Sequence, residues 1–358
     1  MPSSEDIKYM RRALSVARRG LGRVWPNPSV GCVLVKDGVV LAQTRTADGG
    51  RPHAEALALG KAGDAAKGAT AYVTLEPCLH ETITPSCAKS LIKAGVKRVV
   101  IGCKDPDPRT AGQSIKLLSD AGVVVECGVL ESESIELNCG FILKINKKRP
   151  FVNVKTSTSL DGKIAMASGE SKWITGDAAR KHVHQMRGQY DAILTGVGTI
   201  LKDDPQMNVR LPGKVHSPVR VILDTHLRTP LNARILSPDA AVYIFYQDGD
   251  IKGFAGMKHV HLVHMNPHDL QRVATYMAAE VGITRFMVEA GAAVTTSFLR
   301  AGLCDRLSWY RAPVIMGADT YDLTRDISYA QLSECLRLQR VGTRRLGEDL
   351  LEIYKNTQ

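Results

Sequence analysis

The sequence predicts an α/β protein built from two domains, and three observations lead to that prediction. Its 358 residues are too many for one ordinary hydrophobic core. Short apolar stretches of strand character alternate with amphipathic stretches of helical character, a pattern typical of layered α/β folds. A polar, basic segment that ends in a proline, residues 144–150, interrupts the alternation and is the expected linker. We therefore expect one domain over 1–146 and a second over 147–358.

The first elements are predicted from a cap and a turn. Ser3 or Ser4 can cap a helix whose first turn is acidic, which the positive end of a helix dipole favours. Apolar stretches 30–35 and 39–42 flank a Lys-Asp-Gly turn and predict a β-hairpin. A further helix is expected to begin near His53. The other elements expected in this half are strands 71–75, 98–102 and 123–127 and helices 85–94, 112–121 and 131–143.

The pattern starts again after Pro150 and predicts a second α/β domain. The sequence contains no internal repeat and no low-complexity tract. The elements expected in this half are strands 151–155, 192–195, 219–224, 242–246, 285–289 and 306–311 and helices 177–186, 267–280 and 295–301.

Composition narrows the classes of function. A formal net charge of +11 allows binding of nucleic acid or small anions, but aromatic residues, at 5%, are too few for base-stacking platforms. We therefore expect an anionic metabolite and no nucleic acid as the partner. No apolar run approaches the ~20 residues that span a bilayer, and the acidic N-terminus does not resemble a signal peptide. A cytoplasmic protein without a membrane partner is expected. The eight cysteines are scattered, which predicts reduced thiols.

Three residues of the types that zinc prefers stand at predicted element boundaries. His53 begins a helix, Cys78 follows a strand, and Cys87 lies near the start of the next helix. An imidazole and two thiolates are a typical ligand set for catalytic Zn²⁺, which leaves a fourth position for water. The nearby carboxylate of Glu55 can move a proton from that water to a leaving amine. The sequence predicts one zinc ion per chain in a hydrolytic deaminase; ordinary buried thiols and a helix-capping histidine are the alternative.

Together with their neighbours, these motifs resemble one family. The spacing between the two cysteines is longer than in Cys-x-x-Cys deaminases. The chain resembles the bifunctional riboflavin-biosynthesis enzymes, in which a pyrimidine deaminase is joined to a reductase. The resemblance implies a cytidine-deaminase-like α/β/α sandwich followed by a dihydrofolate-reductase-like α/β domain. The matching segments are PNPSVG at 26–31, TLEPCLH at 74–80, KTSTSLDG at 155–162, SGESKWIT at 168–175, GVGT at 196–199, DDP at 203–205, NVR at 208–210 and VEAGA at 288–292.

For the N-terminal domain, the resemblance implies hydrolytic deamination of 2,5-diamino-6-ribosylamino-4(3H)-pyrimidinone 5′-phosphate. The residues carried over are His53, Cys78 and Cys87 for zinc, Glu55 for catalytic proton transfer, and Asn27 and His80 for the substrate. An asparagine in a proline-bracketed turn can instead bond its own backbone, and His80 can be a surface histidine.

The chain departs from the family pattern around the zinc motif. The family commonly has a histidine shortly before His-Ala-Glu, where this chain has Arg45 and Thr46. It commonly has Gly-Lys or Gly-Arg between the cysteines, where this chain has Thr82 and Ile83, and a proline in place of Ser86. The lost cation would act at the substrate, and Arg45 is a candidate replacement. A reductase with a zinc-binding but inactive or redirected deaminase domain is therefore an alternative.

For the C-terminal domain, the resemblance implies NADPH-dependent reduction of the ribosyl group, which gives 5-amino-6-(5-phosphoribitylamino)uracil. Glycines between a strand and a helix let backbone N–H groups cradle a phosphate, and arginines suit the substrate's 5′-phosphate. The implied NADPH contacts are Ser157, Trp173, Thr199, Asp203, Thr225, Gly291, Ala292, Ala293, Val294, Thr295, Thr296 and Ser297. The implied substrate contacts are Lys155, Ser171, Arg187, Met207, Arg210 and Glu289.

Other interpretations stay open at this point. Trp173 can be a core residue, and Arg187 can lie on a solvated helix face. A nucleic-acid deaminase is compatible with the basic charge and the zinc motif, but it gives no role to the second domain. The resemblance also implies a homo-oligomer, a dimer or a tetramer.

Overall fold

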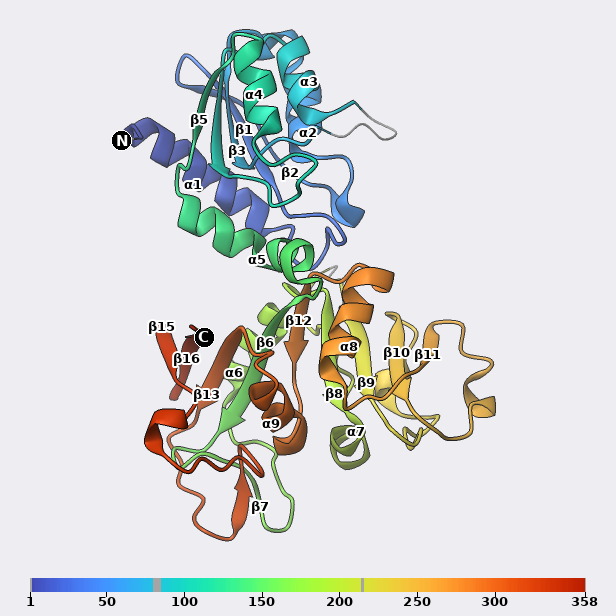
Figure 1. The fold of residues 1–358 in the computed structure, drawn as a ribbon. Helices are drawn as coiled ribbons and strands as arrows, with labels where there is room; N and C mark the ends of the chain where they lie inside the picture. The colour runs from blue at the N-terminus through green and yellow to red at the C-terminus, as the bar shows by residue number, and fades with distance from the viewer. Residues whose placement is uncertain (1, 80–84, 214–215, 358) are drawn as a thin grey trace. The chain divides into compact units, whose positions relative to one another are not determined.

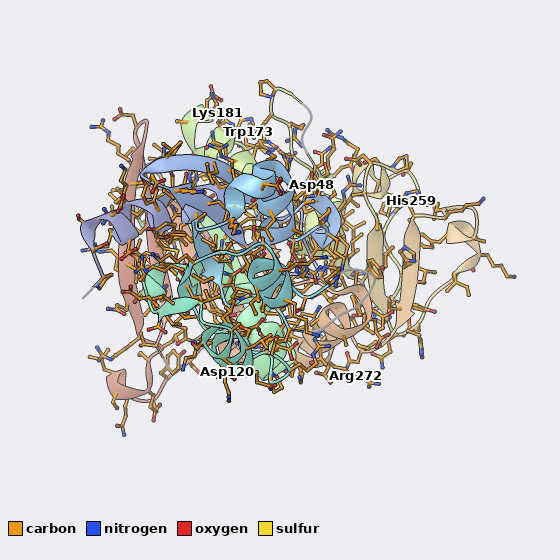
Figure 2. All side chains as sticks on the ribbon, turned by 90° about the horizontal axis from the view of Figure 1, so that it is seen from above. Asp48, Asp120, Trp173, Lys181, His259 and Arg272 are labelled. Atoms are coloured by element: carbon orange, nitrogen blue, oxygen red, sulfur yellow. The ribbon has the colours of Figure 1, made fainter. Side chains whose placement is uncertain are left out.

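The chain forms two compact units, Met1–Arg149 and Pro150–Gln358 (Figure 1). The computed structural model describes residues 2–79, 85–213 and 216–357. All eight cysteines are free thiols, as their scattered positions predicted. None of the described helices combines the length and the apolar character needed to cross a bilayer. Exposed charges of both signs occur in each unit, and Figure 2 labels Asp48, Asp120, Lys181 and Arg272 among them.

The N-terminal unit is a three-layer sandwich. Its strands are β1 (Gly31–Lys36), β2 (Val39–Arg45), β3 (Thr70–Leu75), β4 (Arg98–Cys103) and β5 (Val124–Cys127). Its helices are α1 (Ser4–Arg18), α2 (Ala54–Ala62), α3 (Cys87–Lys93), α4 (Gln113–Asp120) and α5 (Glu131–Lys147). The sheet order is β2-β1-β3-β4-β5, antiparallel around β1 and parallel from β3 to β5. α1 and α5 cover one face, and α2, α3 and α4 cover the other (Figure 1).

Both faces of this sheet are buried, and β1 shows how the sequence achieves it. Cys32 and Leu34 join the core beneath α2, α3 and α4, while Val33 and Val35 join the core beneath α1. Because side chains alternate along a strand, an unbroken apolar run fills two cores at once. The predicted hairpin is confirmed, since β1 and β2 pair in antiparallel register.

The C-terminal unit contains a nine-stranded sheet of order β11-β10-β9-β8-β12-β6-β13-β16-β15. Its strands are β6 (Phe151–Thr158), β8 (Ala192–Gly196), β9 (Val219–Leu223), β10 (Val242–Tyr246), β11 (Val260–His264), β12 (Arg285–Val288), β13 (Arg306–Arg311), β15 (Leu338–Leu346) and β16 (Asp349–Asn356). A separate antiparallel pair joins β7 (Lys163–Met166) and β14 (Thr320–Asp322). The helices are α6 (Asp177–Arg187), α7 (Val197–Asp203), α8 (Leu270–Tyr276), which continues as a π-helical turn over Met277–Val281, and α9 (Ala292–Arg300).

The seven strands from β11 to β13 are parallel neighbours, and only β16 runs antiparallel to β13. The carboxyl ends of β6, β8 and β12 therefore meet at one edge of the sheet. Ligands of open α/β sheets bind at such an edge, where the order of the strands reverses. Short 3₁₀ turns complete the described secondary structure at Asp48–Gly50, Gly63–Ala66, Arg234–Leu236, Lys252–Phe254 and Leu332–Glu334.

Two expectations about the elements need correction. The expected linker over 144–150 was wrong for its first four residues, because α5 continues to Lys147 and only Lys148 and Arg149 lie between it and the next unit. The positive charges of Lys144 and Lys147 favour the negative end of the helix dipole, so a basic run extends the helix instead of ending it. The sequence pattern did not predict helix α7 or strands β7, β11, β14, β15 and β16.

Candidate active sites

The three predicted metal ligands meet in the N-terminal unit. His53 is the N-cap residue of α2, Cys87 is the first residue of α3, and Cys78 follows β3. His53 Nδ1 lies 3.5 Å from Cys78 Sγ and 3.4 Å from Cys87 Sγ. The ligand atoms of all three lie within 4.8 Å of one another, and this is the group that can hold a metal ion among the described residues.

These distances fit a zinc ion. A nitrogen and a sulfur bound tetrahedrally to one Zn²⁺, at about 2.1 and 2.3 Å, stand about 3.5 Å apart. The two thiols differ in pKa because they hydrogen-bond each other. Hydrogen bonding from Cys87 lowers the pKa of Cys78 to about 4, whereas hydrogen bonding to Cys78, together with burial, raises the pKa of Cys87. A thiolate at Cys78 is ready to bind a cation.

Glu55 lies in the first turn of α2, two residues after His53, and its side chain is buried. Burial, followed by the negative charge of Cys78, raises the pKa of Glu55 to about 7. A carboxyl group with a pKa near neutral pH can both accept and release a proton, which suits a proton carrier. Glu55 lines the same pocket as His53 and Cys78.

That pocket has a volume of about 240 Å³, enough for a small heterocycle, and we call it the deaminase pocket. Its lining residues are Pro26, Asn27, Pro28, Val30, Thr46, His53, Glu55, Leu75, Glu76, Cys78, Asp105, Asp107, Arg109, Phe141, Lys144 and Ile145. Asn27 reaches the pocket as the resemblance implied, and its amide Nδ2 also donates to Gly50 O at 2.9 Å. The bond therefore ties the turn to a distant backbone carbonyl and not to its own backbone, and the substrate contact of Asn27 stays a prediction.

The structure assigns local roles to the positions where the chain departs from the family pattern. Thr46 lines the pocket, but its hydroxyl accepts from Val30 N at 3.0 Å and donates to Pro28 O at 3.2 Å. Arg45 does not line the pocket, because its guanidinium bonds Thr46 O and Asp48. Ser86 caps α3 through a bond from Lys89 N. The predicted substrate contact His80 and the altered pair Thr82-Ile83 lie outside the described residues.

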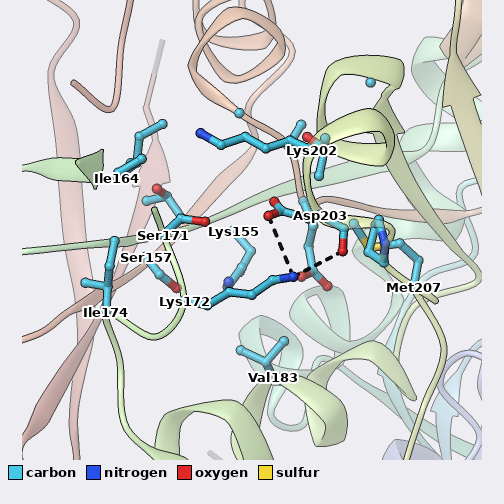
Figure 3. A pocket seen from close by; sticks show the side chains of 18 of the residues that line it. Lys155, Ser157, Ile164, Ser171, Lys172, Ile174, Val183, Lys202, Asp203 and Met207 are labelled. Carbon is cyan, nitrogen blue, oxygen red and sulfur yellow. Dashed lines mark hydrogen bonds and ion pairs between the residues drawn. The ribbon is translucent and has the colours of Figure 1, made fainter. Parts of the chain in front are cut away.

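A larger pocket of about 790 Å³ lies in the C-terminal unit, at the carboxyl ends of β6, β8 and β12, and we call it the reductase pocket. Figure 3 shows Lys155, Ser157, Ser171, Asp203 and Met207 around it, with Lys172 Nζ donating to Asp203 O at 3.2 Å. The predicted contacts that line it are Lys155, Ser157, Ser171, Trp173, Arg187, Thr199, Asp203, Met207, Arg210, Glu289, Gly291, Ala292, Ala293 and Val294.

A buried ion pair marks one wall of the reductase pocket. Glu289 Oε1 accepts from Arg187 Nε at 2.7 Å, and Oε2 accepts from Nη2 at 2.9 Å. Arg187 Nη1 donates to Asn208 O at 2.9 Å. Burial alone would raise the pKa of Glu289, but the charges of Arg187 and Lys155 outweigh it and lower the pKa to about 2. Arg187 is thus a buried pocket residue and does not lie on a solvated helix face.

The start of α9 supplies an anion cradle on another wall. Gly291 is its N-cap, with φ −72° and ψ 178°, so the backbone itself does not require glycine. A Cβ at Gly291 would meet no atom within 4 Å. The missing side chain leaves space in front of the N–H groups of Ala292 and Ala293, where the helix dipole favours a phosphate.

Both halves of the chain, each with its own pocket, match known protein families. The description "RibD C-terminal domain" matches residues 150–351, and "Cytidine and deoxycytidylate deaminase zinc-binding region" matches residues 3–103. "Riboflavin biosynthesis protein RibD" of Aquifex aeolicus is 39% identical over 352 residues, which cover 98% of each chain. The chain belongs to the RibD family.

Solved RibD structures share the whole fold. RibD of Acinetobacter baumannii, form 1, is 39% identical, with a TM-score of 0.91 and 99% of each chain covered. A Thermotoga maritima protein described as a diaminohydroxyphosphoribosylaminopyrimidine deaminase/5-amino-6-(5-phosphoribosylamino)uracil reductase is 35% identical, with a TM-score of 0.89 and 98% of each chain covered. The expected fold is confirmed: a cytidine deaminase domain precedes a dihydrofolate-reductase-like RibD reductase domain.

As a RibD family member, the chain is a deaminase and reductase of riboflavin biosynthesis, and its deaminase binds zinc at the site of His53, Cys78 and Cys87. Four residues implied for NADPH are not among the described residues that line the reductase pocket, namely Thr225, Thr295, Thr296 and Ser297. Thr225 Oγ1 is 3.2 Å from His268 Nε2, and Thr296 Oγ1 accepts from Arg325 N at 2.8 Å. Thr295 and Ser297 bond backbone carbonyls of their own helix start, Ala290 O and Ala293 O.

Sequence reasoning missed several charged pocket residues. Asp105, Asp107 and Arg109 follow β4, and their position at the carboxyl end of a parallel strand is the signal that could have found them. The other basic residues that it missed are Lys144 in the deaminase pocket and Lys172, Arg180, Lys202, Arg234 and Arg325 in the reductase pocket.

Proposed function

We propose that residues 1–146 are the deaminase domain and 147–358 the reductase domain of one enzyme with two consecutive reactions. The first converts 2,5-diamino-6-ribosylamino-4(3H)-pyrimidinone 5′-phosphate to the corresponding uracil with release of ammonia. The second reduces the ribosyl group with NADPH to give 5-amino-6-(5-phosphoribitylamino)uracil. A cytoplasmic homo-oligomer that binds this phosphorylated pyrimidine completes the proposal.

The convergence of His53, Cys78 and Cys87 beside Glu55 carries the deaminase proposal. Zinc, when bound, lowers the pKa of a coordinated water and makes it a nucleophile near neutral pH. Glu55 would accept a proton from the water that adds to the ring carbon bearing the amine. Glu55 then gives the proton to the departing nitrogen, which leaves as ammonia. Burial of Glu55 holds its carboxyl group in one place for both transfers.

The reductase proposal is supported by Gly291 at the start of α9 and by the cations Lys155, Arg187 and Arg210 that line the same pocket. Nicotinamide, when bound, supplies the hydride that reduces C1 of the opened ribosyl group. Gly291 and its neighbours would hold cofactor phosphate, and Lys155 would orient the ribosyl oxygens. Arg210 is better suited than Arg187 to the substrate phosphate. Nε, Nη1 and Nη2 of Arg187 already donate to protein acceptors, whereas Arg210 uses only Nη1 in this way among the described residues.

A coupled assay on purified, zinc-loaded protein tests the proposal. Ammonia release is followed from the diaminopyrimidinone ribosyl phosphate, with NADPH oxidation recorded in the same cuvette. We expect ammonia first and NADPH consumption after it. NADPH oxidation only on pre-deaminated substrate would leave the reductase and contradict the deaminase.

The variant Glu55→Gln sharpens the test. We expect it to lose ammonia release by at least about 100-fold, the usual scale for a general acid–base residue. Zinc content and NADPH oxidation of pre-deaminated substrate should match those of the unsubstituted chain. Unchanged ammonia release would contradict the role of Glu55.

A further inference from the structure

Carboxylates dominate the charged lining of the deaminase pocket. The carboxylates among its described lining residues are Glu55, Glu76, Asp105 and Asp107. The side chains there with a lasting positive charge are Arg109 and Lys144. An anionic substrate that enters such a pocket meets repulsion unless a cation receives it. The proposed substrate carries a phosphate, so the position of these cations decides how it binds.

The guanidinium of Arg109 is held on one side and available on the other. Its Nε donates to Asp107 Oδ1 at 2.9 Å and to Oδ2 at 3.0 Å, and Nη2 also donates to that carboxylate. Nη1 has no protein acceptor among the residues that the structure describes, and the side chain is 68% exposed. A planar guanidinium with free N–H donors matches a phosphate better than an ammonium does.

The partner of Arg109 is itself fixed. Asp107 is buried, and its backbone N–H donates to Asp105 Oδ1 at 2.8 Å. The backbone N–H of Arg109 donates to Asp107 Oδ1 at 3.0 Å. These bonds hold the turn that carries the guanidinium, so little side-chain entropy is lost when Arg109 binds a ligand.

The buried carboxylate of Glu76 ties the loop of residues 105–112 to the end of β3, the strand that leads to Cys78. Glu76 Oε2 accepts from Asp105 N at 3.2 Å and from Gly112 N at 3.0 Å, which closes both ends of the loop. Its Oε1 accepts from the Ser114 hydroxyl at 2.8 Å. Glu76 stands two residues before Cys78. The loop is therefore tied closely to the zinc site.

We propose that Arg109 binds the 5′-phosphate of the deaminase substrate and so selects phosphorylated over unphosphorylated pyrimidines. The inference rests on the proposed function and names the residue that recognises its substrate class. Asp107 offsets part of the charge of the guanidinium and sets its direction. The phosphate is bound by Arg109 at the pocket, while the ring to be deaminated lies beside Glu55.

The test compares two substrates in two variants of the full, zinc-loaded chain. Ammonia release is measured against concentration for the ribosyl phosphate and for the same compound after phosphatase treatment. Arg109→Met should raise KM for the phosphorylated substrate by ~10- to 100-fold, the scale of a lost charge-assisted hydrogen bond. Its KM for the unphosphorylated compound and its kcat should change by less than about twofold. Arg109→Lys keeps the positive charge but loses the planar set of N–H donors. Its KM for the phosphorylated substrate should lie between those of the unsubstituted chain and Arg109→Met.

Arg12→Met is the matched control, since Arg12 is an exposed arginine of α1 that donates to Gln43 outside the pocket. It should leave all constants unchanged. The ratio of KM for the unphosphorylated compound to KM for the phosphorylated one is compared between the unsubstituted chain and Arg109→Met. The same ratio in both would overturn the assignment of Arg109 alone. No ammonia from the unsubstituted chain with either substrate would overturn the proposed deaminase together with this assignment.

Discussion

Arg187 and Glu289 form an ion pair that is almost fully removed from water in the reductase pocket. Two charges in such a place are stabilised only while both are present, because each compensates the desolvation of the other. Lys155 adds a second positive charge nearby, and burial lowers its pKa while Glu289 opposes that effect. At this scale a single carboxylate balances two cations.

The substitution Glu289→Gln should therefore be costly. It leaves the Arg187 guanidinium buried without a counter-charge, and we expect the C-terminal unit to lose about 3–5 kcal/mol of unfolding free energy. Denaturant unfolding measures the loss. Glu348→Gln is the control, because the Arg345–Glu348 pair is exposed and worth no more than about 1 kcal/mol. Similar small losses in both variants would contradict the role of burial.

Single residues were predictable from sequence where their chemistry is rare. His53, Cys78 and Cys87 were found because few residue types bind zinc, and their spacing limits the choice further. Arg109 was not found, since arginine is common and its use depends on a loop bonded to Glu76. A role that arises from tertiary contacts leaves no local pattern.

Helix α1 shows how one element is fixed to the sheet. Ser3 caps it in a capping box with Asp6, so the expected cap is confirmed. Asp6 also accepts from Tyr72 OH at 3.1 Å and from Arg98, which joins the helix to β3 and β4. Hydrogen bonding from Arg98 lowers the pKa of Asp6 to about 2.

This pKa predicts how stability depends on pH. An aspartate with a folded-state pKa below its unfolded value stabilises the fold above about pH 4, and that stabilisation disappears as pH falls towards 2. Asp6→Asn should therefore lose about 2 kcal/mol at pH 7, and the difference from the unsubstituted chain should shrink between pH 4 and 2. Urea unfolding at several pH values measures it. A difference that stays constant down to pH 2 would contradict the ion-pair explanation.

Elements were predicted well where both faces are buried and poorly at the edge of a sheet. The apolar runs of β1, β3 and β8 gave clear signals because each fills two cores. β15 is mostly exposed and carries arginines, so it shows no alternation that distinguishes it from a loop. Its pairing with β16 comes from backbone hydrogen bonds, which sequence patterns do not reveal.

At the scale of the molecule, the described residues that line each pocket all belong to one unit. The two chemistries therefore depend on separate sets of side chains. The presence of two α/β units was predictable from length and alternation. The insertion of β12 between β8 and β6 was not, because it pairs residues that lie 94 (286 and 192) and 134 (285 and 151) positions apart along the chain.

Removal of zinc tests this separation. Treatment of the full chain with a chelator should abolish ammonia release, because the three metal ligands belong to the deaminase pocket's unit. NADPH oxidation of pre-deaminated substrate should keep its rate. Addition of Zn²⁺ should restore ammonia release, and metal analysis before and after provides the control. Loss of both activities on chelation would contradict the independence of the two sites.

The two hydrogen bonds that Glu76 accepts from Asp105 N and Gly112 N have a consequence for divergence within the family. Both bonds are donated by backbone N–H groups, which every residue except proline supplies, so side chains between 105 and 112 can change without breaking them. At Gly112 itself a φ of 77° favours glycine. New sequences between these two points can alter the pocket wall while the segment after β3 that carries Cys78 stays where it is. Selection can thus retune which substrate is admitted without rebuilding the metal centre.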